Sequence, residues 1–216
     1  MVKKGCRYLF SILSIILIYY VVSHIVNNQF ILPKYGLIYD YFKNVNGKDI
    51  FINTFATVKK AIYSYLFSMT LALIIAIISS KPTIYLLINP YISILKTLPT
   101  ISIILLAIIW LGTEKALYLI PLLVVFPILY EKFVYEIRNI DPHLREVSEV
   151  YKFSVVDKIK YLYFYPLLEG LILSLKQTFG LCFKIIVMAE VIAHANLGLG
   201  ARIQNEKTNL EMPGVF

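Results

Sequence analysis

Long apolar runs recur along this chain, and they constrain its fold more than any other feature. Several reach the roughly 20 residues that an α-helix needs to cross a ~30 Å hydrocarbon core. Of the 216 residues, 59% are hydrophobic and only 16% are charged, so a soluble domain of this size could not bury the apolar surface. Backbone groups in lipid must be paired internally, which favours helices. The sequence therefore predicts an all-α, polytopic bundle of membrane helices in a single domain, residues 1–216.

Five membrane spans are expected in this chain. They cover about residues 8–26, 54–80, 84–111, 116–133 and 167–194. The basic start at Lys3, Lys4 and Arg7 would also suit a signal peptide, but the apolar run exceeds the usual ~7–15 residues and no small-x-small cleavage site follows. We therefore expect an uncleaved first span with a cytoplasmic N-terminus. The closing residues 212–216 resemble the opening of another apolar helix, so a sixth span is expected after them.

The segments between these spans are polar or contain proline. Residues 27–53 are expected to form a polar loop, with Asn53 or Thr54 capping the next helix. Residues 112–115 are expected to form a tight turn between the third and fourth spans. Because Pro90 and Pro99 flank Lys96, the helix there is expected to be broken.

Composition excludes several functional classes. The net charge of +8 comes from scattered basic residues that mostly flank apolar runs, which is an orientation signal in membrane proteins rather than a nucleic-acid footprint. Cys6 and Cys182 lie far apart in or beside apolar runs and are expected to be small buried hydrophobes. The sequence carries no nucleotide-binding, nucleophile-elbow or zinc-protease motif. We therefore expect no cofactor, no metal and no catalysis by this chain, and no nucleic-acid partner.

A charged insert, residues 138–165, interrupts the apolar chain. Asp141 followed by Pro142 predicts a helix start, and Ser154 with Asp157 fits a capping box for a second short helix. In the first helix, apolar and small side chains share one face at helical spacing: Leu144, Val147, Ser148 and Tyr151. The two helices suit either a membrane surface or a groove on a soluble partner.

Four ionisable residues lie within apolar runs, namely Lys96, Lys176, Lys184 and Glu190. Such groups usually face a cavity or a partner, since a charge at mid-bilayer costs at least about 2.5–3.5 kcal/mol. One interpretation is a water-lined path for an anionic solute, with Lys96, Pro99, Lys184 and Glu190 as path or gate candidates. In the other, Lys176 and Lys184 extend to an interface or pair with Glu190, which acts as a structural carboxylate near the outer end.

Several motifs, taken together and in order, resemble those of ABC importer permeases of the nitrate/sulfonate/taurine subgroup. Glu146-Val147-Ser148 with Pro166 resembles the family's Glu-Ala-Ala loop. The other matching segments are Asn53–Lys59, Asn89-Pro90 through Pro99, Ile109-Trp110-Leu111-Gly112, Ala189-Glu190-Val191-Ile192 and Leu197-Gly198-Leu199-Gly200. The resemblance covers roughly residues 53–216.

The resemblance implies a multi-pass permease subunit in a bacterial cytoplasmic membrane, forming the path of a small anion such as a sulfonate, taurine or nitrate. It implies a second permease copy in a homodimer, two copies of an ABC ATPase and an extracytoplasmic solute-binding protein. The ATPase would bind the insert through Arg145, Glu146, Val147, Ser148, Glu149, Tyr151, Lys152, Phe153 and Ser154. An ATP-independent secondary carrier or a membrane assembly factor is the alternative, with the insert lying on the bilayer.

The insert departs from the family pattern at a glycine. Counting forward from Glu146 places the glycine position at Lys152, whereas counting back from Pro166 places it at Phe153. Val147 and Ser148 replace the alanines. The sequence alone leaves the position of this turn open between Lys152 and Phe153.

Overall fold

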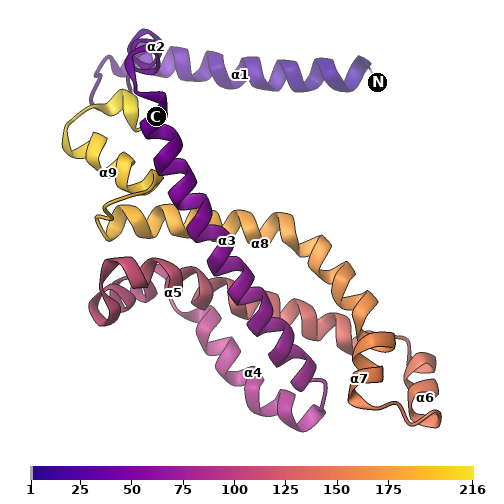
Figure 1. The fold of residues 1–216 in the computed structure, drawn as a ribbon. Helices are drawn as coiled ribbons and strands as arrows, with labels where there is room; N and C mark the ends of the chain where they lie inside the picture. Colours follow the sequence, from indigo (N-terminus) through magenta and orange to yellow (C-terminus); the bar gives the residue numbers. More distant parts are fainter. Residues whose placement is uncertain (1) are drawn as a thin grey trace.

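The described part of the chain is helical throughout, without strands (Figure 1). The structure is a computed structural model; it describes residues 2–216, and the side chains of residues 10–175 and 177–216. The side chains of Cys6 and Lys176, both interpreted above, lie outside those ranges. The predicted all-α membrane bundle is confirmed.

The helices follow one another along the chain with short connections. The long ones are α1 (Val2–Val26), α3 (Gly47–Ile78), α4 (Pro82–Thr97), α5 (Thr100–Arg138) and α8 (Phe164–Ile192). The short ones are α2 (Tyr35–Asn44), α6 (Pro142–Val150), α7 (Val155–Asp157), the π-helix η1 (Lys158–Tyr163), α9 (Leu199–Thr208) and the 3-10 helix η2 (Met212–Gly214).

Two of the described helices, α3 and α5, are long and apolar enough to cross a membrane. A bent pair, Val155–Leu175 and Gln177–Ile192, meets at 48° and makes a third span if it is counted as one. Residues Phe10–Val26 form a shorter apolar helix. The five predicted spans therefore stay a prediction.

The core lies where α3, α5 and α8 pack together. Along α3, small side chains recur about every fourth residue and are buried: Ala61, Ser64, Ser68, Ala72 and Ala76. Small residues on one face let helix backbones approach closely, which is how helices associate in lipid. Large side chains of α5 fill the opposite side, and Tyr130 and Phe133 are fully buried there.

The apolar stretch 84–111 is not one continuous helix. α4 ends at Thr97 and α5 begins at Thr100, with Leu98 extended (ψ 129°). A proline disfavours the helical conformation of the residue before it, so Pro99 sets this break. A second break falls inside α5 at Gly112, where φ is +72° and ψ is 167°. The turn expected at residues 112–115 is therefore a kink at one glycine, followed by helix.

The polar loop expected at residues 27–53 is wrong in its second half. α2 occupies residues 35–44, and α3 starts at Gly47 instead of at Thr54. The physical reason is Asn46, whose side chain accepts a hydrogen bond from the backbone N–H of Lys48 at 3.1 Å and caps the helix. Asn53, expected as a cap, lies inside α3 and is nearly buried.

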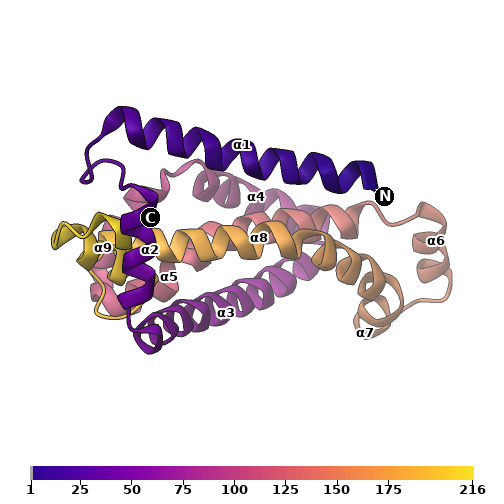
Figure 2. The same cartoon turned by 90° about the horizontal axis from the view of Figure 1, so that it is seen from above.

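Short helices gather at the two ends of the molecule (Figure 2). α6 and α7 project from one end, while α2 and α9 lie at the other. α1 runs along the side, and its N-terminus points toward the α6 end. Tyrosine hydroxyls join α1 to the segment after it: Tyr19 donates to the carbonyl of Pro33 at 2.8 Å, and Tyr35 to that of Ile16 at 3.0 Å.

Candidate functional site

The projecting helix α6 starts where the sequence predicted, after Asp141. The Asp141 carboxylate accepts from the backbone N–H of His143 at 2.9 Å, and Pro142 occupies the first helical position. These two residues fix where α6 starts, because the carboxylate satisfies a free donor and the proline ring presets φ.

The end of α6 is a left-handed turn at Lys152, where φ is +48°. The backbone N–H of Lys152 donates to the carbonyl of Glu149 at 3.0 Å, and that of Phe153 donates to the carbonyl of Ser148 at 2.9 Å. This pair of bonds is a Schellman motif, which normally places glycine at the left-handed position. The geometry thus selects Lys152 over Phe153 as the position that corresponds to glycine in the family pattern.

Arg145 fastens α6 to the end of α5. Its Nη2 donates to the carbonyl oxygens of Ile137 and Arg138, both at 2.8 Å. Those carbonyls belong to the last turn of α5, where helical partners run out. Ser148 faces the same way: it is 3% exposed, and its hydroxyl donates to the carbonyl of Arg145 at 2.7 Å.

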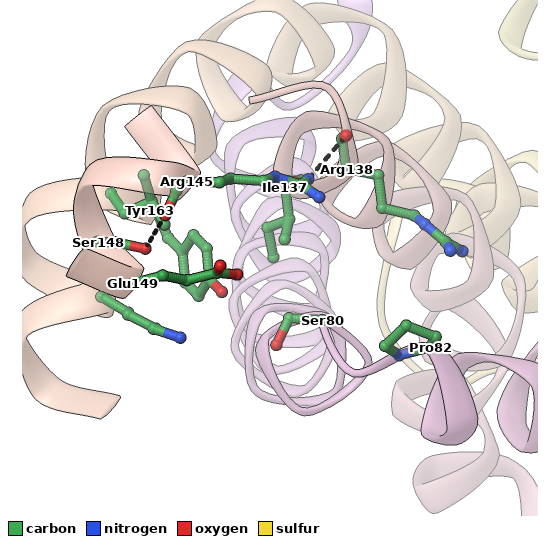
Figure 3. Close-up of a pocket in the computed structure, with 10 residues that line it drawn as sticks. Ser80, Pro82, Ile137, Arg138, Arg145, Ser148, Glu149 and Tyr163 are labelled. Carbon is green, nitrogen blue, oxygen red and sulfur yellow. Dashed lines mark hydrogen bonds between the residues drawn. The ribbon is translucent and has the colours of Figure 1, made fainter. Parts of the chain in front are cut away.

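A polar cavity of about 170 Å³ lies between α6, the ends of α3 and α5, and η1 (Figure 3). Arg138, Arg145 and Lys158 supply positive charge to its lining, and Glu149 supplies the negative charge. Of the predicted coupling residues, Arg145, Ser148 and Glu149 therefore lie on the inner side of α6.

The outer side of α6 is apolar and has no partner among the described residues. Leu144, Val147 and Tyr151 lie there at helical spacing and are 55%, 46% and 74% exposed. Glu146 lies beside them, with 74% of its side chain exposed. The predicted apolar face exists, but Ser148 is turned away from it toward the bundle.

The second helix of the insert starts at Ser154. Its hydroxyl accepts from the backbone N–H of Asp157 at 3.2 Å, and the Asp157 carboxylate accepts from the backbone N–H of Ser154 at 3.1 Å. The predicted capping box is confirmed. The Ser154 hydroxyl, which donates to the carboxylate, and the backbone bond lower the pKa of Asp157 below its ordinary value. Tyr161 of η1 packs against the Phe153 ring, with centroids 6.1 Å apart.

Glu190 is fully buried and ion-paired with Lys60, at 2.9 Å between Oε1 and Nζ. The Thr57 hydroxyl and the backbone N–H of Gly200 also donate to this carboxylate, each at 2.9 Å to Oε2. Lys60 donates further to the carbonyl of Leu197 at 2.6 Å. A buried ion pair needs such additional bonds, since desolvation of each charge costs several kcal/mol.

The Gly-Leu-Gly segment closes over this carboxylate because two glycines leave room for it. A Cβ on Gly198 would lie 2.2 Å from Oε1 of Glu190, and a Cβ on Gly200 would lie 2.3 Å from the carbonyl oxygen of Val187. Gly198 also has φ +142°, a conformation that L-residues rarely adopt. Its backbone N–H donates to the Asn53 side chain at 2.9 Å. Glu190 is therefore enclosed by protein rather than open to a path.

The remaining pathway candidates lie on α4, in the break before α5, and on α8. Lys96 pairs with Glu131 at 2.5 Å, and both side chains are about two-fifths exposed. Pro99 is exposed at the break between α4 and α5. Lys184 is exposed on α8 and does not contact Glu190, whose cationic partner is Lys60.

Sequence reasoning missed Thr57 and Lys60 as partners of Glu190, and it missed Glu131. A signal for the first two was available: Thr57, Lys60 and Ser64 recur at helical spacing inside an apolar run. In lipid, such a polar stripe must meet partners on a neighbouring helix. Among the described residues, no group of three or more His, Cys, Asp or Glu side chains could hold a metal ion.

Comparisons with known proteins identify relatives of one kind. No family model matches the sequence. The chain is 28% identical over 127 residues, 58% of its length, to the putative aliphatic sulfonates transport permease protein SsuC of Escherichia coli (strain K12). It is 26% identical over 165 residues, 74% of its length, to the protein of the same name from Bacillus subtilis (strain 168).

These matches cover 48% and 58% of the two relatives, so the chain spans about half the length of the curated proteins it matches. Both relatives are named as permeases for aliphatic sulfonates, within the subgroup that the sequence motifs resemble. The chain is accordingly similar to two transport permeases that are named for aliphatic sulfonates.

Proposed function

We propose that this chain is the permease subunit of an ABC importer, forming a solute path that a separate ATPase subunit drives. Support comes from the similarity to two sulfonate permeases and from the polar, capped insert between α5 and α8. The chain itself would bind no nucleotide. The solute would be a small anion, and an aliphatic sulfonate fits the names of the relatives best.

The observation that carries this proposal is the construction of α6. Its inner side is fixed to the last turn of α5 by Arg145, while its outer side offers Leu144, Val147 and Tyr151 without a partner among the described residues. An exposed amphipathic helix of this kind fits a groove on a soluble protein. Because α6 is fixed to α5, a push on α6 would move α5 as a lever and change access to the path.

The ATPase would contact the outer residues Glu146, Val147 and Tyr151, together with the turn at Lys152, Phe153 and Ser154. Arg145, Ser148 and Glu149 would position α6 rather than touch the ATPase. Two ATPase copies, a second copy of this permease and an extracytoplasmic solute-binding protein complete the proposed assembly.

An ATPase lies in the cytoplasm, so the α6 end of the molecule would face that side. The N-terminus of α1 points the same way (Figure 2) and would also be cytoplasmic. The chain would then sit in the cytoplasmic membrane of a bacterium, with α2 and α9 on the outer side.

The test is co-purification of an ABC ATPase with the tagged full chain from its own membranes. We expect Val147→Asp to reduce the retained ATPase at least about tenfold, because a carboxylate in an apolar contact loses its hydration without a partner. Glu146→Lys is expected to act in the same direction by reversing a charge beside the contact.

Tyr39→Asp on α2 is the matched control, since Tyr39 is 68% exposed and lies at the opposite end of the molecule. It should leave ATPase retention unchanged. If Val147→Asp and Tyr39→Asp behaved alike, α6 would not be the ATPase contact. Crosslinks from position 147 to lipid alone would support an insert that lies on the bilayer.

A further inference from the structure

The further inference concerns the side of the bundle where α4 meets α5, and it rests on the proposed permease function. We propose that a polar seam there lines a water-filled part of the route of a small organic anion. The seam consists of Tyr85, Asn89, Ser93 and Lys96 on α4 and of Glu131, Tyr135 and Arg138 on α5. Of these residues, the sequence singled out only Lys96 for a path.

The α4 half of the seam is a distinct sector of its helix. Tyr85, Asn89, Ser93 and Lys96 follow one another at steps of four, four and three residues, which places them on one face. A second sector faces the core, where Ile92 is 3% exposed and Ile88 and Leu95 pack against buried residues. A third sector is exposed and apolar, with Leu86 and Leu87 at 71% and 66%. The polar sector lies between the other two.

The α5 half shows the same separation. Glu131, Tyr135 and Arg138 lie at steps of four and three residues, and none of them is buried. Of the residues between them, Phe133, Val134 and Ile137 are buried in the core, while Lys132 and Glu136 are part-exposed and pair with each other at 2.7 Å. A helix that spans a membrane therefore carries a stripe with an acid, a phenol and a guanidinium on its open side.

The two halves of the seam touch at both of its ends. Lys96 Nζ lies 2.5 Å from Glu131 Oε2 at one end of the seam. At the other end the Arg138 guanidinium lies over the Tyr85 ring, 3.9 Å from its centroid. Between these contacts is a cavity of about 330 Å³, lined by Asn89 and Ser93 from α4 and by Glu131, Tyr135 and Arg138 from α5.

Lipid is an unsuitable neighbour for this seam. The Lys96 and Glu131 side chains are 40% and 39% exposed, and each charge exposed to hydrocarbon would cost at least about 2.5–3.5 kcal/mol. If water instead of hydrocarbon contacts these two side chains, the cost of exposing their charges to lipid is avoided. At about 30 Å³ per molecule, the cavity holds on the order of ten waters, or one small organic ion with part of its hydration shell.

The charges of the seam favour an anion over a cation. Lys96 and Arg138 contribute two positive charges and Glu131 one negative charge, so the formal balance is one positive charge. The carboxylate of Glu131 pairs with the ammonium group of Lys96. An anion that moves along the seam would exchange with this carboxylate at Lys96, while Arg138 attracts it at the other end.

The experiment measures cysteine labelling in membrane vesicles that contain the full chain with its ATPase. Asn89→Cys and Ser93→Cys are placed in a cysteine-free background (Cys6→Ser, Cys182→Ala). The matched controls are Leu87→Cys and Tyr91→Cys, on the exposed apolar sector of the same helix. The probes are a sulfonate-bearing and a trimethylammonium-bearing methanethiosulfonate of similar size.

We expect positions 89 and 93 to react at least about tenfold faster than 87 and 91, because thiolates form in water and not in hydrocarbon. At position 93 the sulfonate probe should react about threefold or more faster than the cationic probe, from the charge of Lys96 and Arg138. Lys96→Gln should abolish this preference, and Lys96→Arg should keep it. Glu131→Gln should increase it.

Equal rates on the two sectors would overturn the inference, as would a preference for the cationic probe. Equal rates on the two sectors are also the expected result if the second permease copy covers the seam. ATPase co-purification, measured on the same samples, separates the two proposals. Retained ATPase with an unlabelled seam refutes only the route, and lost ATPase with a labelled seam refutes only the coupling.

Discussion

At the scale of single residues, the most constrained point of the molecule is the carboxylate of Glu190. Three groups donate hydrogen bonds to it: the Lys60 ammonium, the Thr57 hydroxyl and the backbone N–H of Gly200. Lys60 also donates to the carbonyl of Leu197. The two glycines of the Gly-Leu-Gly segment are needed there because a side chain at either position would collide with Glu190 or the α8 backbone. Packing and hydrogen bonding therefore explain the spacing of Glu190 and the two glycines, and no contact of Glu190 with a solute is needed to explain it.

Gly198→Ala is expected to destabilise the protein by about 2–4 kcal/mol, because the new methyl group would meet the Glu190 carboxylate and the backbone at φ +142° is strained for alanine. The measurement is the thermal midpoint in detergent. Gly180→Ala is the control: nothing lies within 4 Å of its Cβ position inside α8, so alanine should stabilise that helix by about 0.5–1 kcal/mol. Equal midpoints for the two variants would contradict the packing argument.

At the scale of elements, α6 is a short helix whose two ends are set by its own capping bonds and whose position is set by the bonds of Arg145 to the preceding helix. Asp141 and the turn at Lys152 define its length, while Arg145 ties it to α5. The left-handed turn is formed by lysine, although an L-residue in this conformation costs roughly 1–2 kcal/mol. The backbone bond from Phe153 to Ser148 and the contact of the Phe153 ring with Tyr161 hold the turn despite that cost.

Lys152→Gly is therefore expected to stabilise the protein by about 0.5–1 kcal/mol and to raise the thermal midpoint by a few degrees, roughly 1–4 °C. The gain is smaller than the strain removed, since glycine also makes the unfolded chain more flexible. Lys160→Gly is the control with the opposite sign, because Lys160 lies in the π-helix η1, where glycine should destabilise by about 0.5–1 kcal/mol. A lower midpoint for Lys152→Gly would contradict the left-handed geometry.

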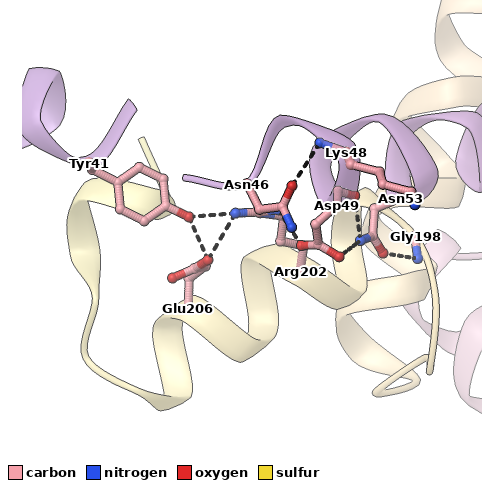
Figure 4. Close-up of polar contacts among 8 residues, drawn as sticks. All are labelled: Tyr41, Asn46, Lys48, Asp49, Asn53, Gly198, Arg202 and Glu206. Atoms are coloured by element: carbon pink, nitrogen blue, oxygen red, sulfur yellow. Dashed lines mark hydrogen bonds and ion pairs between the residues drawn. The ribbon is translucent and has the colours of Figure 1, made fainter. Parts of the chain in front are cut away.

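At the scale of the whole molecule, the end opposite α6 is held together by Arg202 (Figure 4). Its guanidinium donates to Asp49 of α3 at 2.6 Å and to the Tyr41 hydroxyl of α2 at 2.8 Å, and it pairs with Glu206 of α9 at 3.4 Å. Tyr41 in turn donates to Glu206 at 2.5 Å. One side chain of α9 thus binds α2 and α3, with partners 161 and 153 residues earlier in the sequence.

Arg202→Gln is expected to lower the thermal midpoint by roughly 2–6 °C, because it removes charge-assisted hydrogen bonds worth about 1.5 kcal/mol and leaves two carboxylates without their cation. Lys207→Gln on the same helix is the control, since Lys207 is exposed, and it should shift the midpoint by less than about 1 °C. ATPase retention should be unaffected by either variant, given that α9 lies far from α6 (Figure 1). Equal shifts would show that Arg202 does not stabilise this end.

Much of the local structure follows from residue order alone. Caps and breaks depend on neighbours within a few positions, so Asp141, the Ser154 capping box and the break near Pro99 were all predictable. The start of α3 was missed because the expected cap, Asn53, binds the backbone of Gly198, and the side chain of Asn46 forms the capping bond instead. The sequence also could not decide whether Lys152 or Phe153 takes the left-handed conformation, because neither residue type favours it.

The sequence by itself determined that this chain forms membrane helices, that a polar hairpin separates two of them, and which transporter group it resembles. These conclusions rest on hydropathy, spacing and motif order, which are properties of neighbouring residues. Only the tertiary structure decided that Glu190 pairs with Lys60, that Arg145 faces α5, and that Lys96 meets Glu131 beside a polar cavity. Each of those pairs joins residues on different helices, and which helix faces meet depends on how the whole bundle packs.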